Sequence, residues 1–260
     1  MTFKATTLKR KPELAEQIDR LAWEAWPTFM LHADTPHWGS LFDTFAGFQI
    51  LFLDSIDSLI ALGHTIPFVW DGTLEDLPPT IDEVMERAVD AHRERSAPTA
   101  LSALAALVSP KYQGRGLSSE ILWTMRSLAA EHGMHSLVAP VRPTLKGLYP
   151  LIPIERYARW QRPDGAPFDP WLRVHWRLGA EYLKAAPEAT IITGTVAEWE
   201  DWTGMSFPES GEYVVPGALQ PITINREQDV GTYSDPNIWI RHSVTGEELA
   251  EYSSDHRLSK

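Results

Sequence analysis

The sequence predicts a mixed α/β fold that forms a single domain over residues 1–260. Short apolar runs alternate with amphipathic stretches of helical period, which is typical of strands interleaved with helices. The middle of the chain reads as strand, glycine-rich turn, helix and strand, an order that joins parallel strands by a right-handed crossover. No repeat, low-complexity tract or long flexible linker divides the chain, so we expect one domain whose best-defined part is residues 100–141.

The N-terminal part predicts three strands and two helices. Leu14, Ile18 and Leu21 recur at helical spacing after a proline that suits a first helical turn. The later strands are rich in Ile, Leu, Phe and Val. Thr80 followed by Glu83 is the signature of a capping box at the start of a second helix. We therefore expect strands at 3–8, 49–53 and 58–69, and helices at 12–26 and 80–95.

The middle of the chain contains an uncharged apolar run and a sharp break. Residues 101–108 fit a buried strand or a piece of helix, and the Pro, Gly114 and Gly116 that follow interrupt regular structure. Ser118 or Ser119 can cap the next helix, and Gly133 can end it. The predicted order is a strand at 101–108, a helix at 118–132 and a strand at 136–141.

The C-terminal part begins with a long segment, residues 142–171, that holds six prolines and many arginine and aromatic side chains. It is either a lid over an acceptor site or an extension that packs on the sheet. Pro170 can start a helix after it. We expect extra β-segments at 189–199, 213–224 and 237–242, with Pro216-Gly217 and Asp235-Pro236 as breaks, and then a polar, mobile tail.

Composition and charge exclude several functions. There are 23 Lys plus Arg and 35 Asp plus Glu, so the net charge of −12 argues against binding to nucleic acid. The absence of cysteine excludes disulfides, thiolate zinc sites and a cysteine nucleophile. His132 and His135 are three residues apart, a pair that by itself makes a poor metal site, so we expect no metal there. No apolar run is long enough for a membrane span and no signal peptide is evident, which predicts a cytoplasmic protein.

The glycine-rich turn has the chemistry of an anion cradle. Glycines allow close approach to the backbone, and the first N–H groups of a helix have no intrahelical acceptor. Arg115 adds a cation within the turn. The alternative is a plain tight turn. The turn lacks the Lys-Ser/Thr pair of a triphosphate-binding loop and the spacing of a dinucleotide fingerprint.

The run Leu107-Val108-Ser109-Pro110-Lys111-Tyr112-Gln113-Gly114-Arg115-Gly116-Leu117-Ser118 resembles the acyl-CoA motif of GCN5-related N-acetyltransferases, Arg/Gln-x-x-Gly-x-Gly/Ala. Gln113 takes the first position and Gly116 the central glycine, while Ser118 stands where the family has Gly or Ala. The resemblance implies a mixed central sheet flanked by helices, with an unusually long insertion before the last helix. It also implies that the backbone of Leu107 and Val108 holds the pantetheine arm, and that the pyrophosphate lies on residues 113–118, namely Gln113, Gly114, Arg115, Gly116, Leu117 and Ser118.

The same resemblance implies direct transfer of an acyl group, expected to be acetyl, from acetyl-CoA or another acyl-CoA to the amine of a small molecule. Two residues are candidates for the acid that protonates the leaving thiolate. His175 in VHWRLGA falls where the family often has Tyr, and a rival alignment of TLKGLY selects Tyr149. The alternatives are a non-catalytic acyl-CoA or ligand-binding module and another reaction on acyl-CoA, such as hydrolysis. A homodimer is compatible with the sequence.

Overall fold

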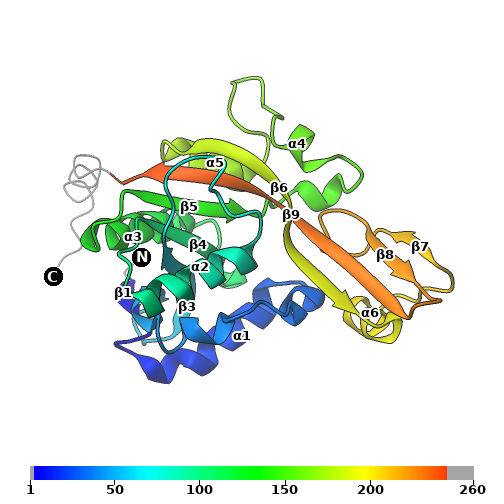
Figure 1. Cartoon of the computed structure of the whole chain (residues 1–260), viewed down its shortest axis with the longest axis horizontal. Coiled ribbons are helices and arrows are strands. Elements are labelled where there is room, and N and C mark those ends of the chain that lie inside the picture. The colour runs from blue at the N-terminus through cyan, green and yellow to red at the C-terminus, as the bar shows by residue number, and fades with distance from the viewer. Residues whose placement is uncertain (1–2, 245–260) are drawn as a thin grey trace.

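A computed structural model of the chain describes residues 3–244, which form a nine-stranded sheet with helices on both faces (Figure 1). The strand order is β1-β2-β3-β4-β5-β9-β8-β7, and β6 also pairs with β9. In the described ladders only β4 and β5 run parallel, as the predicted crossover requires. The strands are β1 Lys4–Thr7, β2 Gln49–Leu53, β3 Leu59–Phe68, β4 Ala100–Val108, β5 Ser136–Val141, β6 Glu181–Gly194, β7 Gly211–Tyr213, β8 Ile222–Asn225 and β9 Val230–Ser243. The helices are α1 Ala15–Ala25, α2 Ile81–Glu94, α3 Leu117–Glu131, α4 Ile154–Tyr157, α5 Pro170–Arg177 and α6 Val196–Thr203.

The helices bury the two faces of the sheet separately. On one face, α3 packs Ile121 and Met125 against the apolar side chains of β2 to β5. On the other face, α1 covers β2, β3 and β4 with Ile18 and Leu21, and α2 contributes Met85 to a second core. The apolar stripes expected of the first helix and of the helix after the glycine turn are therefore the surfaces that are buried.

The first two helices lie within the predicted ranges 12–26 and 80–95 but are shorter than predicted. A short 3₁₀ turn at Pro12–Leu14 precedes α1. Thr80 caps α2 by accepting a bond from the Glu83 N–H at 3.2 Å, as expected. The reciprocal bond of a capping box is replaced, because the Glu83 carboxylate pairs with Arg87 instead. A capping box with both bonds is found at α6, which the sequence analysis did not predict.

The C-terminal part corrects the predicted β-segments. β6 begins at Glu181 and ends at Gly194, so part of the segment expected at 189–199 is the helix α6. The segment expected at 213–224 is split between β7 and β8. Asp235-Pro236 does not end a strand, because β9 continues through it opposite a shift of register between Ala186 and Thr190 of β6. A bulge tolerates proline because no ladder bond is needed there.

β6 and β9 extend beyond the main sheet and carry a small lobe made with β7, β8 and α6 (Figure 1). Trp199 of α6 is fully buried at the centre of that lobe. Because α6 follows α5 in the chain, the helix that begins at Pro170 is not the last helix of the fold, in contrast to the prediction. The polar tail was expected after His242, but β9 continues to Ser243, one residue further, and residues 245–260 lie outside the described part of the chain.

The proline-rich segment packs on the sheet. Ile154 and Tyr157 of α4 are buried in the same core as α3, and Asp169 ties the segment together by accepting bonds from the Tyr157 hydroxyl at 2.9 Å and the Leu145 N–H at 2.8 Å. This arrangement agrees with an extension that covers the sheet. Within residues 3–244 no helix is long and apolar enough to cross a membrane.

Candidate functional site

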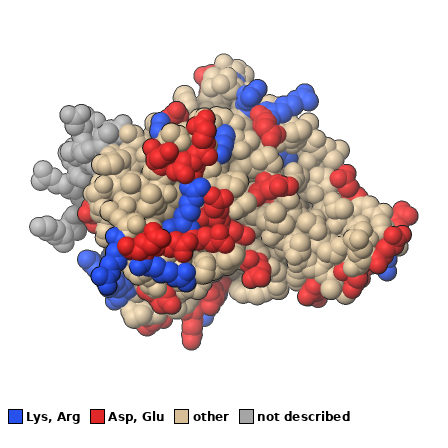
Figure 2. Space-filling model, viewed as in Figure 1, with Lys and Arg blue, Asp and Glu red and all other residues tan. Residues whose placement is uncertain are grey.

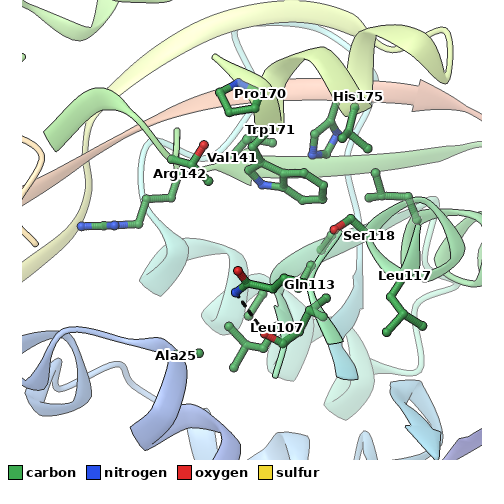
Figure 3. Close-up of a pocket in the computed structure, with 18 of the residues that line it drawn as sticks. Ala25, Leu107, Gln113, Leu117, Ser118, Val141, Arg142, Pro170, Trp171 and His175 are labelled. Carbon is green, nitrogen blue, oxygen red and sulfur yellow. Dashed lines mark hydrogen bonds between the residues drawn. The ribbon is translucent and has the colours of Figure 1, made fainter. Parts of the chain in front are cut away.

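A gap opens in the sheet between β4 and β5. The two strands pair only over Ala100–Ser102 and Ser136–Val138, although β4 continues to Val108. Beyond that point the backbone groups of the two strands form no ladder hydrogen bonds with each other, and the space between the strands is a cavity of about 750 Å³. Its walls come from residues 103–108 of β4, residues 139–144 after the gap, the glycine-rich loop, the end of α1 and one side of α5 (Figure 3).

A bulge in β4 lies at the point where the gap opens. His64 of β3 is opposite Ala105, and Thr65 is opposite Ala103, so Leu104 is an extra residue in β4. A bulge of this kind bends a strand and changes the direction of its neighbours. Residues of β4 on either side of Leu104 can thereby turn away from β5.

The glycine-rich loop forms the floor of the cavity. Gly114 and Gly116 have φ values of 73° and 83°, a region that strains any residue with a side chain. Gly116, rather than Ser118 or Ser119, is the N-cap of α3, and no side chain caps this helix. A Cβ built on either glycine meets no atom within 4 Å, so the loop surface is open. The first turn of α3 thus presents its N–H groups to the cavity.

The other residues predicted to hold the cofactor lie around the same cavity. Leu107, Val108, Gln113, Gly114, Gly116, Leu117 and Ser118 all line it. The Gln113 amide donates to the carbonyl of Val108 at 3.5 Å, which joins the loop to the end of β4. Arg115 is exposed, and its guanidinium lies 5.2 Å from the ring of Tyr112. Arg177, an exposed residue of α5 that was not expected from the sequence to belong to the site, also borders this cavity.

His175 lies on α5 at the cavity wall and is 1% exposed (Figure 3). Its Nδ1 is 2.9 Å from Nε2 of His242, and no described group bonds to its own Nε2. Burial, followed by the neighbouring His242, holds the pKa of His175 well below its ordinary value. The imidazole is therefore neutral at pH 7.

Tyr149, the residue selected by the rival alignment, packs against other aromatic side chains of segment 142–171. Its ring lies 6.0, 4.9 and 5.8 Å, centroid to centroid, from those of Tyr157, Trp160 and Phe168. Tyr149 lines neither of the two cavities.

A second cavity, of about 210 Å³, lies on the α1 and α2 side of the sheet. It shares part of its wall with the first cavity, through Trp26, Leu104, Ala105, Leu107, Pro140 and Arg142. Three further aromatic or imidazole rings line it, those of Trp38, Phe42 and His64. The two cavities therefore approach each other from opposite sides of the gap between β4 and β5.

Buried polar groups line the wall of the second cavity formed by β6 and β9. Arg142 binds Asp235 through Nε at 2.9 and 3.1 Å, and the Tyr233 hydroxyl donates to the same carboxylate at 2.5 Å. Burial by itself would lower the pKa of Arg142, but the charges and hydrogen bonds of Asp235 and Tyr233 together outweigh this effect and the pKa is raised. The guanidinium therefore stays protonated and paired with Asp235. Asn237 is 3% exposed, and its Oδ1 accepts no bond from any described residue. A buried acceptor of this kind is available to a ligand that donates hydrogen bonds.

Acidic side chains lie near the second cavity at the start of α2. Thr35 and Ile81 line this cavity, and Asp82, which follows Ile81 in the sequence, bonds to the Thr35 side chain. Burial, and then the charges of Glu86 and Asp34, raise the pKa of Asp82, which shows that carboxylates are concentrated here. Figure 2 shows red side chains gathered over the region of α2. Such a field attracts cations.

The sequence analysis did not single out His64 or Asn237. A lone histidine in the apolar run SLIALGHTIPFV was the available signal for His64, whereas nothing local distinguishes Asn237. The described residues contain no cluster of three or more His, Asp or Glu side chains that could hold a metal ion.

No model of a known protein family matches the chain. The chain is 31% identical to the arginine N-acetyltransferase AvaD of Aspergillus versicolor, over an alignment covering 93% of this chain and 94% of that protein. In structure it is similar to the loading GNATL domain of CurA from Lyngbya majuscula, with a TM-score of 0.64, 16% identity, and coverage of 94% of this chain and 98% of that one. It is also similar to the GphF GNAT-like decarboxylase in complex with isobutyryl-CoA, with a TM-score of 0.59, 14% identity, and coverage of 94% and 100%. At these identities the two structures establish the fold.

Proposed function

Because the chain belongs to the GCN5-related N-acetyltransferase superfamily, we propose that its acceptor is a cationic amine that carries a guanidinium group, with arginine as the first molecule to test. The chain is an acyl-CoA-dependent N-acetyltransferase that acts on a small-molecule amine. The alternative of a non-catalytic acyl-CoA-binding module is therefore set aside. The identity of the acceptor and the roles of individual residues are the parts that we propose.

The observation that carries the proposal is the pair of cavities on either side of the gap between β4 and β5. The larger cavity has a helix N-terminus and backbone N–H groups, which suit phosphates. The smaller cavity has aromatic rings, buried oxygen acceptors and an acidic rim, which suit a cation. A donor and an acceptor entering from opposite sides would meet at the shared wall formed by Ala105 and Leu107.

In the donor cavity, the edge of β4 at Leu107 and Val108 that does not pair with β5 holds the pantetheine arm as a neighbouring strand would. The loop from Gln113 to Ser118 holds the pyrophosphate, with Gly116 permitting close approach and the α3 dipole adding about 0.3–1 kcal/mol. We propose that Arg177, which borders the donor cavity, and the exposed Arg115 of the loop contact the outer phosphates.

In the acceptor cavity, the volume of about 210 Å³ is below the usual range for a drug-sized ligand and suits a molecule the size of one amino acid. The ring faces of Trp26 and Trp38 can receive a planar cation. Asn237 Oδ1 accepts one of its N–H groups. The amide product forms when the acceptor nitrogen attacks the thioester carbonyl directly, and positioning of the two substrates supplies most of the rate.

His175 is proposed to act next to the leaving thiolate in the donor cavity. Since it is neutral at pH 7, it can donate a hydrogen bond to sulfur but does not bring a ready imidazolium. His175→Gln is expected to lower kcat while acetyl-CoA binding stays within about threefold of the wild type. An unchanged kcat would show that the residue serves only to pack α5 against β9.

The acceptor is tested with acetyl-CoA and three amines, measuring released thiol and the mass of the product. Arginine should be acetylated, and citrulline, its neutral urea isostere, should give kcat/KM lower by roughly tenfold or more, because the charge is lost in a carboxylate-rich site. Phenethylamine serves as an apolar amine without a guanidinium. Equal rates with arginine and citrulline would contradict the guanidinium assignment, and fragmentation of the product identifies the acetylated nitrogen.

A further inference from the structure

His64 is a buried imidazole beside the place where donor and acceptor meet. It lies on β3 directly opposite Ala105, the β4 residue that lines both cavities. It is 5% exposed and lines the acceptor cavity only. The β4 bulge at Leu104 adjoins it. No glutamate occurs in β4 to serve as a base, since its sequence is ALSALAALV.

The hydrogen bonds around His64 determine which ring nitrogen carries the proton. His64 Nδ1 is 2.9 Å from Oε1 of Gln49. The Gln49 amide nitrogen donates to the carbonyls of Phe45 and Thr65, both at 2.9 Å. Because both N–H groups of that amide are used on carbonyls, its Oε1 can only accept, and the proton must be on Nδ1 of His64. Nε2 is left with an unshared lone pair on the side of the ring away from Gln49.

The surroundings keep that lone pair available. The rings of Trp38 and Phe42 meet the imidazole edge to face, each with a centroid separation of 5.8 Å, and hold its orientation. Burial lowers the pKa of His64 to about 4, so the ring is neutral at pH 7. Gln49 is itself fully buried, so the arrangement is fixed before any substrate arrives.

We propose that Nε2 of His64 is the base that takes the proton from the acceptor nitrogen, and that Gln49 is a positioning residue that fixes the tautomer. The inference rests on the proposed function only in taking the second cavity as the acceptor site. As the N–C bond forms, the N–H proton passes to Nε2 and the C–S bond breaks with its electron pair going to sulfur. The imidazolium, stabilised by the Gln49 oxygen at Nδ1–H, returns the proton to the thiolate, so the products are the amide and free CoA.

Kinetics and chemical rescue test the assignment, with the amine that the wild type acetylates best. His64→Gly should lower kcat by roughly 10²-fold or more, the usual contribution of a general base, while the affinity for acetyl-CoA measured by calorimetry stays within about threefold. Added imidazole should restore at least about a tenth of the lost rate by entering the space left by the side chain. His135→Gln, at an exposed histidine outside both cavities, is the matched control and should behave as the wild type.

Two outcomes would overturn the proposal: a His64→Gly kcat within threefold of the wild type, or a lowered kcat that imidazole does not raise. ¹⁵N NMR of histidine-labelled wild-type protein gives an answer independent of variant folding, because it should show His64 with an unprotonated Nε2. A protonated Nε2 would refute the base assignment. If arginine is not the acceptor but another amine is, the guanidinium proposal fails while the His64 measurements on that amine remain decisive.

Discussion

The glycine at the start of α3 allows a direct test of the anion cradle. Gly116 and Gly133 both have positive φ, at 83° and 72°, and a Cβ on either meets nothing within 4 Å. Replacing either by Glu should cost about 1–2 kcal/mol of stability for the left-handed conformation and leave the fold intact. The two glycines lie on either side of α3 and are 17 positions apart in the sequence, so at 1.5 Å per residue they are about 25 Å apart. Only a carboxylate at 116 would face a bound diphosphate.

The expected loss of CoA affinity follows from Coulomb's law. One pair of like charges about 6 Å apart costs about 0.7 kcal/mol in water and about 2.8 kcal/mol at an effective dielectric constant of 20. With two phosphate charges, Gly116→Glu should lose at least about 1.4 kcal/mol, which is a tenfold rise in Kd. At about 25 Å the same charge at 133 is screened by salt. Calorimetric titration with CoA, alongside thermal melting of both variants, measures this. Equal affinities for the two variants would refute the placement of the pyrophosphate on residues 113–118.

Three further predictions concern the fold that holds the site. Burial lowers the pKa values of His64 and His242 to about 4, so as the pH falls the unfolded chain binds protons near pH 6.5, before the folded chain does. The free energy of unfolding, measured with urea, should therefore fall between pH 6.5 and pH 4 by about 3 kcal/mol for each residue. A free energy of unfolding that does not change over this pH range would contradict the prediction. Asp235→Asn leaves the guanidinium of Arg142 without its buried carboxylate and should cost about 3–5 kcal/mol in the same assay, whereas a loss below about 1 kcal/mol would show that the pair is dispensable. Gly231→Ala would place a methyl group against a buried tryptophan of α6 and should cost about 1–3 kcal/mol, and an unchanged unfolding midpoint would show that the lobe repacks freely.

The sequence was sufficient to predict the strand–loop–helix–strand unit that forms the proposed donor site. The apolar run 101–108, the Pro and Gly punctuation and the amphipathic helix after it are local features, and the strand, loop, helix and parallel strand they indicate are found at β4, α3 and β5. A prediction from local sequence was wrong where pairing with a distant strand determines the structure. Asp235-Pro236 was read as a break, yet the neighbouring strand β6 shifts register opposite it and β9 continues.

The residues of the proposed acceptor site could not have been found in the sequence. His64, Arg142 and Asn237 are far apart along the chain, and only the pairing of β3 with β4 and of β5 with β9 brings their strands to the same cavity. Likewise, motif alignment offered His175 and, in a rival alignment, Tyr149, and only the fold shows that His175 lies at the wall of the larger cavity while Tyr149 packs within segment 142–171. A motif made of consecutive residues depends on local conformation and can be recognised in the sequence. A cavity lined by strands that are distant in the sequence forms only when long-range pairing brings those strands together.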